Sequence, residues 1–231
     1  MQLTPEQEAL NSTTTAERLC ELAKSNKTII LQAIAVNPNT PPNILVKLFT
    51  QYPTQIFKNP ALDLLILENP QFLDILYKQN KNIFHYQGLP LFFLKWAVQH
   101  ENKDIRVNLA ASSFTPVHIL EILASDRNRD VRIKIVKNKS TPNQVLCNLI
   151  SDRDEGVRLA VLNDIRIPLE YLIALSQNKE YIIRLSIAKN PRTPISVLQL
   201  LRKDSYESIR IAAQNNLDKS NIIVQNWQMR S

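Results

Sequence analysis

The fold is decided by residues 130–142, DVRIKIVKNKSTP, because their pattern recurs along the chain. The recurrence is marked by arginines that stand 26 residues apart, namely Arg106, Arg132, Arg158, Arg184 and Arg210. A fixed period of about 20 to 50 residues is the signature of a repeat protein whose units stack on their neighbours. The sequence therefore predicts an all-α solenoid, a right-handed superhelix of repeats of about 26 residues.

The second half of each unit predicts a helix. Proline follows the arginine by ten residues and suits a first helical position, with a preceding threonine as N-cap: Thr115, Thr141 and Thr193. Leucines at 14 and 17 residues share one face. We expect these leucines to form the core: Leu120, Leu123, Leu146, Leu149, Leu172, Leu175, Leu198 and Leu201. Asp126, Asp152, Asp204 and Asn178 follow this helix and can cap the next.

The first half of the unit fits two structures. Residues 131–135 alternate as a strand does, yet their apolar positions also fit a helix, and the apolar residue four beyond each arginine favours a short helix, 3₁₀ or α, before the longer one. Asparagine or aspartate ends it, at Asn37, Asn138, Asn190, Asn216 and Asp164. With only two glycines in the chain, asparagine is the natural residue to adopt a left-handed helix end.

Two sets of charged residues follow the period. The register arginines are predicted to pair with nearby carboxylates in a structural ladder, the candidates being Asp104, Asp130, Glu155, Glu180 and Glu207. A basic rim in the turn between the two helices is a candidate anion-binding stripe, as an alternative to a merely solvated surface. It comprises Lys137, Lys139, Arg166, Lys189 and Arg192.

We predict one continuous solenoid domain with five parts. Residues 1–27 form an N-terminal cap and divergent first unit with a capping box at Thr14 and Glu17, and residues 28–51 form a repeat. Residues 52–103 are degenerate repeats in which 62–67 are apolar enough to be buried, and aromatic residues over 84–96 form a local core or, less favoured, an exposed docking patch. Regular repeats occupy 104–216, and 217–231 cap the end.

Composition excludes several classes of function. The chain of 231 residues carries a net charge of +7, mostly beyond residue 100, which permits an acidic or nucleic-acid partner. We expect no membrane span, a cytoplasmic location, and free thiols at Cys20 and Cys147 in preference to a disulfide. His85, His100 and His118 lack metal-ligand spacing, and neither a phosphate loop nor a nucleophile motif is present, so we expect no catalytic, metal or cofactor site and no small-molecule substrate.

The repeat resembles the leucine-rich-repeat variant family of bacterial proteins. The likeness rests on Ile183-Arg184, Ile187-Ala188, Asn190-Pro191, Thr193-Pro194, Leu198 and Leu201, and on residues 37–41. It covers residues 28–50 and 104–216. The resemblance implies alternating 3₁₀-like and α-helices in a right-handed superhelix. One branch of that family carries an iron–sulfur cluster, but Cys20 alone cannot supply its thiolates, so no cofactor is expected.

The favoured function is a non-enzymatic scaffold that binds another protein through its extended surface. A second hypothesis is nucleic-acid binding by phosphate contacts along the rim of residues 134–192. A third, an enzyme on a HEAT-like helical frame, has no catalytic constellation to support it.

Overall fold

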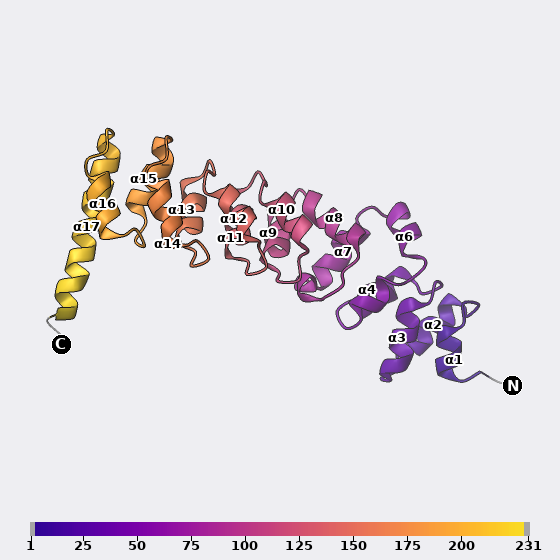
Figure 1. Ribbon diagram of the computed structural model, residues 1–231. Coiled ribbons are helices and arrows are strands. Elements are labelled where there is room, and N and C mark those ends of the chain that lie inside the picture. Colours follow the sequence, from indigo (N-terminus) through magenta and orange to yellow (C-terminus); the bar gives the residue numbers. More distant parts are fainter. Residues whose placement is uncertain (1–2, 229–231) are drawn as a thin grey trace. The chain divides into compact units, whose positions relative to one another are not determined.

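The computed structural model describes residues 3–228, and the side chains of residues 3–219. Every regular element in these residues is a helix, as Figure 1 shows. The all-α fold predicted from the repeat is confirmed, and the first half of the unit is helix, not strand. The chain divides into two compact units, Met1–Gln99 and His100–Ser231, which are described separately below. One continuous solenoid across both units stays a prediction.

The second unit is a row of helix pairs, one pair for each 26-residue repeat. The pairs are α9 (Lys103–Ala111) with α10 (Val117–Leu123), α11 (Arg129–Lys137) with α12 (Asn143–Leu149), α13 (Glu155–Asn163) with α14 (Leu169–Leu175), and α15 (Tyr181–Lys189) with α16 (Ile195–Leu201), followed by α17 (Glu207–Gln228). Successive first helices pack directly on one another, and each second helix packs on the first helix of the next repeat. This nearest-neighbour packing is the defining property of a solenoid.

The relative lengths of the two helices are the reverse of the prediction. The first helix of each pair has 9 residues and the second has 7, and both are α-helices. The proline explains the shorter second helix, because Pro142 has φ −63° and ψ 148° and is the N-cap, one residue before the helix begins. The first helix is longer because it begins at Arg129, three residues before the register arginine, where Asn128 caps it.

The threonine before this proline also has a different role from the predicted N-cap. The hydroxyl of Thr141 donates to the carbonyl oxygen of Ile135 over 2.6 Å, within the preceding helix. Thr115 and Thr193 make the same contact, with Leu109 and Ile187. These buried threonines therefore satisfy a terminal carbonyl of the first helix.

The predicted core register is confirmed. Leu120, Leu146, Leu172 and Leu198 are 0% exposed, and the leucines three residues later are buried as well, apart from the half-buried Leu175. The apolar residues beside each register arginine, such as Val131 and Ile135, are also fully buried. The core is therefore one layer of side chains between the first and second helices of the stack.

The first unit contains helices of less regular length. They are α1 (Pro5–Leu10), α2 (Ala16–Leu22), α3 (Thr28–Val36), α4 (Pro42–Leu48), α5 (Pro53–Ile56), α6 (Leu62–Glu68), α7 (Phe72–Gln79), the 3₁₀ helix η1 (Ile83–His85) and α8 (Leu91–Gln99). The predicted capping box at Thr14 is wrong: Thr15 caps α2, and the Thr14 hydroxyl donates to the Glu8 carbonyl over 2.6 Å. The capping box lies at Thr4 and Gln7. Since Thr14 contacts α1 as Thr141 contacts α11, α1 and α2 form a complete helix pair.

The degenerate stretch combines a confirmed prediction with a wrong one. Aromatic side chains, with Phe93 fully buried at the centre, form a local core: Phe57, Tyr77, Phe84, Phe93 and Trp96. Residues 62–67, expected to be buried, lie mainly at the surface. Leu62 is buried, whereas Leu64 and Leu67 are 62% and 79% exposed. The reason is that α6 packs chiefly on α7, which covers only one side of it.

Candidate functional site

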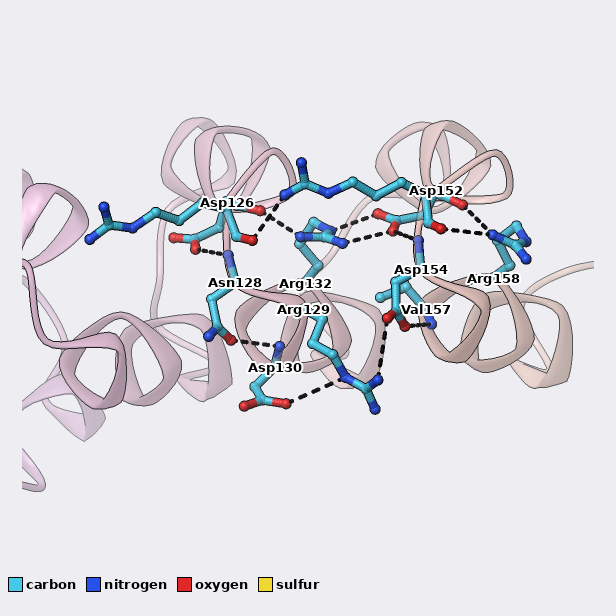
Figure 2. Close-up of polar contacts among 11 residues, drawn as sticks. Asp126, Asn128, Arg129, Asp130, Arg132, Asp152, Asp154, Val157 and Arg158 are labelled. Atoms are coloured by element: carbon cyan, nitrogen blue, oxygen red, sulfur yellow. Dashed lines mark hydrogen bonds and ion pairs between the residues drawn. The ribbon is translucent and has the colours of Figure 1, made fainter.

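An arginine–aspartate ladder runs through the inter-repeat connections of the second unit. The Arg132 guanidinium on α11 forms a two-pronged contact with Asp152, Nε to Oδ2 over 2.7 Å and Nη2 to Oδ1 over 2.8 Å. Its Nη1 donates to the carbonyl of Asp126 over 2.7 Å (Figure 2). Arg106 with Asp126 and Arg184 with Asp204 repeat this arrangement. Each arginine thereby joins the connection before its helix to the connection 20 residues further on.

The partner carboxylates are different from those predicted. Among the described side chains, the candidates Asp104, Asp130, Glu155, Glu180 and Glu207 make no ion pair with a register arginine; Asp130 pairs with Lys103, and Glu155 with Lys189. The true partners are the aspartates predicted only as helix caps. In an α-helix the Cα–Cβ bond tilts toward the N-terminus. Each arginine therefore reaches back from its helix toward the connections, where these aspartates lie.

Burial makes the ladder strong. The side chains of Arg132 and Asp152 are 4% and 6% exposed. Burial alone would raise the pKa of Asp152, but hydrogen bonds from Arg132 and from the Asp154 N–H outweigh it and hold that pKa below its usual value. The hydrogen bonds from Arg184 likewise lower the pKa of Asp204. These carboxylates are therefore ionised, paired and structural.

One rung of the ladder is neutral. Asn178 occupies the position that holds aspartate in the other connections, so Arg158 lacks that carboxylate partner. Its Nε instead donates to the hydroxyl of Ser186 over 3.0 Å, and its Nη1 donates to the carbonyl of Asp152 over 2.7 Å. Arg158 is nevertheless only 3% exposed.

A second ladder, of asparagines, was missed by sequence reasoning. Asn138 has φ −74° and ψ 121°, and no non-glycine residue of the described chain has a positive φ, so the predicted left-handed helix end is wrong. Its Nδ2 donates to the carbonyls of Ala110 and Ser112 in the preceding repeat, over 2.8 and 2.7 Å. Asn37, Asn59 and Asn216 make the same pair of contacts, and Asn190 makes one of them.

Two members of the basic rim belong to this second ladder. Asp164 has no amide donor, and the Arg166 guanidinium takes over, since it pairs with Asp164 and donates to the carbonyls of Val136, Asn138 and Thr141. Arg192 donates in the same way to Leu162, Asp164 and Ile167. Backbone contacts therefore account for both arginines.

The lysines of the rim are more accessible. Lys189 pairs with Glu155, two repeats' first helices apart in sequence, while Lys137 and Lys139 are exposed and form no ion pair within the described chain. The structure thus places all five rim residues near the turns but leaves only these two lysines without an assigned contact. Anion binding by the rim stays a prediction.

The second helices of this unit carry exposed apolar residues at repeated positions. Val117, Leu169 and Ile195 each lie 11 residues beyond a register arginine and are 45–47% exposed. Ile122, Tyr171, Ile173 and Leu200 add to this surface, which we call the second-helix face. Neighbouring helices are joined on it: the charge of the Cys147 thiolate on α12, and a hydrogen bond to that thiol, raise the pKa of Tyr171 on α14. The leucine-based register could have revealed this face, since these positions lie opposite the buried ones.

Within the described residues, no cluster of three or more histidine, cysteine, aspartate or glutamate side chains could hold a metal ion. Cys20 and Cys147 are free thiols, each half-buried. None of the helices described is both long enough and apolar enough to cross a membrane.

Comparison with known proteins finds a solved structure with a similar repeat. No protein-family model matches the chain, and no curated protein matches it. A structure described as a leucine-rich repeat variant with a novel repetitive protein structural motif is 18% identical, with a TM-score of 0.36. The match covers 84% of this chain and 88% of the other. That description names the same kind of repeat as the resemblance noted in the sequence.

Proposed function

We propose that the protein is a non-enzymatic scaffold that binds another protein through the second-helix face. The observation that carries this proposal is the repeated exposure of Val117, Leu169 and Ile195 at one position of the repeat. Single exposed apolar residues are ordinary, but extended apolar surfaces mark interaction sites. A structural role does not require an apolar residue there, since Asn143 occupies the same position on α12.

The face is densest on α14, which supplies the natural centre of an interface. Leu169, Tyr171 and Ile173 are each 44–46% exposed there, whereas Leu172 of the same helix is fully buried in the core. Aromatic and aliphatic anchors near the middle of an interface contribute most of its binding energy. A stack of repeats presents such anchors along an extended surface.

The test replaces two anchors of α14 with charge. Leu169→Asp with Ile173→Asp should abolish partner binding, because the partner would have to bury two carboxylates without counter-ions. The matched control, Asn143→Asp with Asn148→Asp, adds the same charge to exposed positions of α12 without removing apolar area. Wild type and both variants would be immobilised after thermal melts show that they are folded, and retained proteins identified by mass spectrometry after nuclease treatment.

The expected result is a set of proteins retained by the wild type and the control and lost with the α14 variant. Equal retention by all three would refute the second-helix face as the docking surface. Binding that disappears on nuclease treatment and at high salt would favour the alternative, in which the exposed Lys137 and Lys139 contact nucleic-acid phosphates.

A further inference from the structure

An arginine-lined hollow lies at the inter-repeat connections of the second unit, away from the second-helix face. It has a volume of about 490 Å³ and is lined by Arg127, Asn128, Arg129, Arg132, Arg153 and Asp154. These residues come from two successive connections, α10 to α11 and α12 to α13. The repeat therefore places guanidinium groups from neighbouring units around one space.

Contacts with the protein hold several of these arginines in position. Arg153 Nη2 donates to the carbonyl of Arg127 over 2.9 Å, so its side chain lies back across the adjacent connection. Arg129 Nη1 donates to Asp154 over 3.2 Å, as Figure 2 shows. Ordering long side chains before a ligand arrives lowers the entropy lost on binding.

The hollow retains donors that the protein does not use. Arg132 is fully engaged by Asp152 and the Asp126 carbonyl, and it forms only the inner wall. Arg127, by contrast, makes no ion pair within the described chain, and Arg153 uses Nη2 alone. Both residues are exposed. Two largely unsatisfied guanidinium groups thus border the hollow, each with several N–H donors.

Charge in the hollow is unbalanced. Its lining contains four arginines and a single carboxylate, that of Asp154, which also caps α13. Asp152 behind the wall compensates Arg132 only. A monovalent carboxylate would leave positive charge uncompensated, whereas a phosphate monoester brings close to two negative charges and three acceptor oxygens. Guanidinium forks match those oxygens in pairs.

We propose that this hollow binds a phosphate monoester, with Arg127 and Arg153 as its main ligands and Arg129 as a supporting cation. The inference is independent of the second-helix face, since it uses different residues and connections. The ligand could be supplied as free phosphate or on a phosphorylated side chain, and the two sources are distinguished by the probes below.

Calorimetric titration of the full chain at low ionic strength tests the proposal. The probes are inorganic phosphate, N-acetyl-phosphoserine amide and, as a monovalent comparison, acetate. We expect phosphate to bind in the millimolar range or tighter, and acetate to bind roughly tenfold more weakly, since it loses one charge and a pair of acceptors. Binding of the phosphoserine probe would identify a phosphorylated side chain as the source, and binding of phosphate alone would identify the free ion.

The deciding variant is Arg127→Ser with Arg153→Ser, which should weaken phosphate binding by about tenfold or more. Arg202→Ser is the control, because Arg202 is an exposed arginine in the connection between α16 and α17, outside the hollow. It should keep wild-type affinity, and all variants should keep the wild-type melting temperature. Absence of phosphate binding to the wild type, or equal losses in the double variant and the control, would overturn the proposal.

Discussion

Arg132 and Asp152 form a two-pronged contact, with Nε to Oδ2 at 2.7 Å and Nη2 to Oδ1 at 2.8 Å, although 20 residues separate them. The 26-residue period places the equivalent Arg158 one repeat later, where the guanidinium meets the Ser186 hydroxyl instead. The same sequence motif thus forms a charged rung in one repeat and a neutral rung in the next. The difference allows the ion pair to be separated from the rest of the motif.

Arg132→Ala is expected to destabilise the protein more than Arg158→Ala. The first change leaves the Asp152 carboxylate buried without its counter-ion, at a cost of about 3 kcal/mol, toward the low end for buried pairs because hollows on either side admit water. The second change leaves only a hydroxyl and backbone carbonyls, at a cost of roughly 1–2 kcal/mol. Urea denaturation would measure both. Equal losses would mean that Asp152 contributes nothing beyond the backbone contacts.

Stability should fall on acidification through the ladder aspartates. The folded-state pKa values of Asp152 and Asp204 are lowered, so both carboxylates stabilise the fold above their unfolded pKa of about 3.9. This contribution is lost as the pH falls from there through the folded values. A variant with Asp152→Asn and Asp204→Asn should be less stable than the wild type at pH 7, and the two denaturation midpoints should converge at about pH 2–3. A constant gap at all pH values would argue against this origin.

Much of this fold could be predicted because the period acts on short-range features. The register leucines, the division into two helices and the buried arginines all follow from residues that recur at fixed spacing. The partner of each arginine could not be predicted in the same way. Arg132 is equally near in sequence to Asp130 and to the carbonyl of Asp126, and only the backward tilt of helical side chains selects the connection over the helix.

The role of the asparagines was hidden for a related reason. A residue that ends a helix is first read as a local backbone feature, yet Asn138 acts on carbonyls 26 and 28 residues earlier. The pairing of Asp164 with Arg166 in the same role depends on two residues changing together. Neither contact is visible until neighbouring repeats are stacked.

Asn178→Asp should convert the neutral rung into a charged one. Asn178 lies 20 residues beyond Arg158, the spacing at which Arg106, Arg132 and Arg184 meet aspartate. The new carboxylate would keep the contact that Asn178 Oδ1 makes with the Glu180 N–H. We expect stabilisation of about 1 kcal/mol at pH 7, in the range of a hydrogen bond to a charged group less its desolvation.

The control for this change is the same substitution in Arg158→Ala, where no fork remains to bind the carboxylate. There the aspartate should give no stabilisation at pH 7, and the double-mutant cycle would isolate the coupling. Denaturation midpoints of the four proteins provide the measurement. If Asn178→Asp stabilises both backgrounds equally, capping of α15 rather than Arg158 is responsible.

The last prediction transfers the Asp164–Arg166 pair into another repeat. Asn138→Asp should destabilise by about 3 kcal/mol, because it places a carboxylate beside the buried carbonyls of Ala110 and Ser112 and removes their donor. Ser140 stands two residues beyond Asn138, as Arg166 stands beyond Asp164. Adding Ser140→Arg should therefore restore most of the loss, since a guanidinium can pair with the new aspartate and donate to the carbonyls.

The single change Ser140→Arg serves as the control and should alter stability little, because Asn138 still supplies the donor and Ser140 makes one exposed contact, with the carbonyl of Ser113. Thermal or urea midpoints of the four proteins close a cycle whose coupling energy measures the guanidinium contact. A favourable coupling of about 1–2 kcal/mol is expected for hydrogen bonds to charged groups. No coupling would mean that the backbone around residue 164, rather than the aspartate and arginine themselves, allows that exchange.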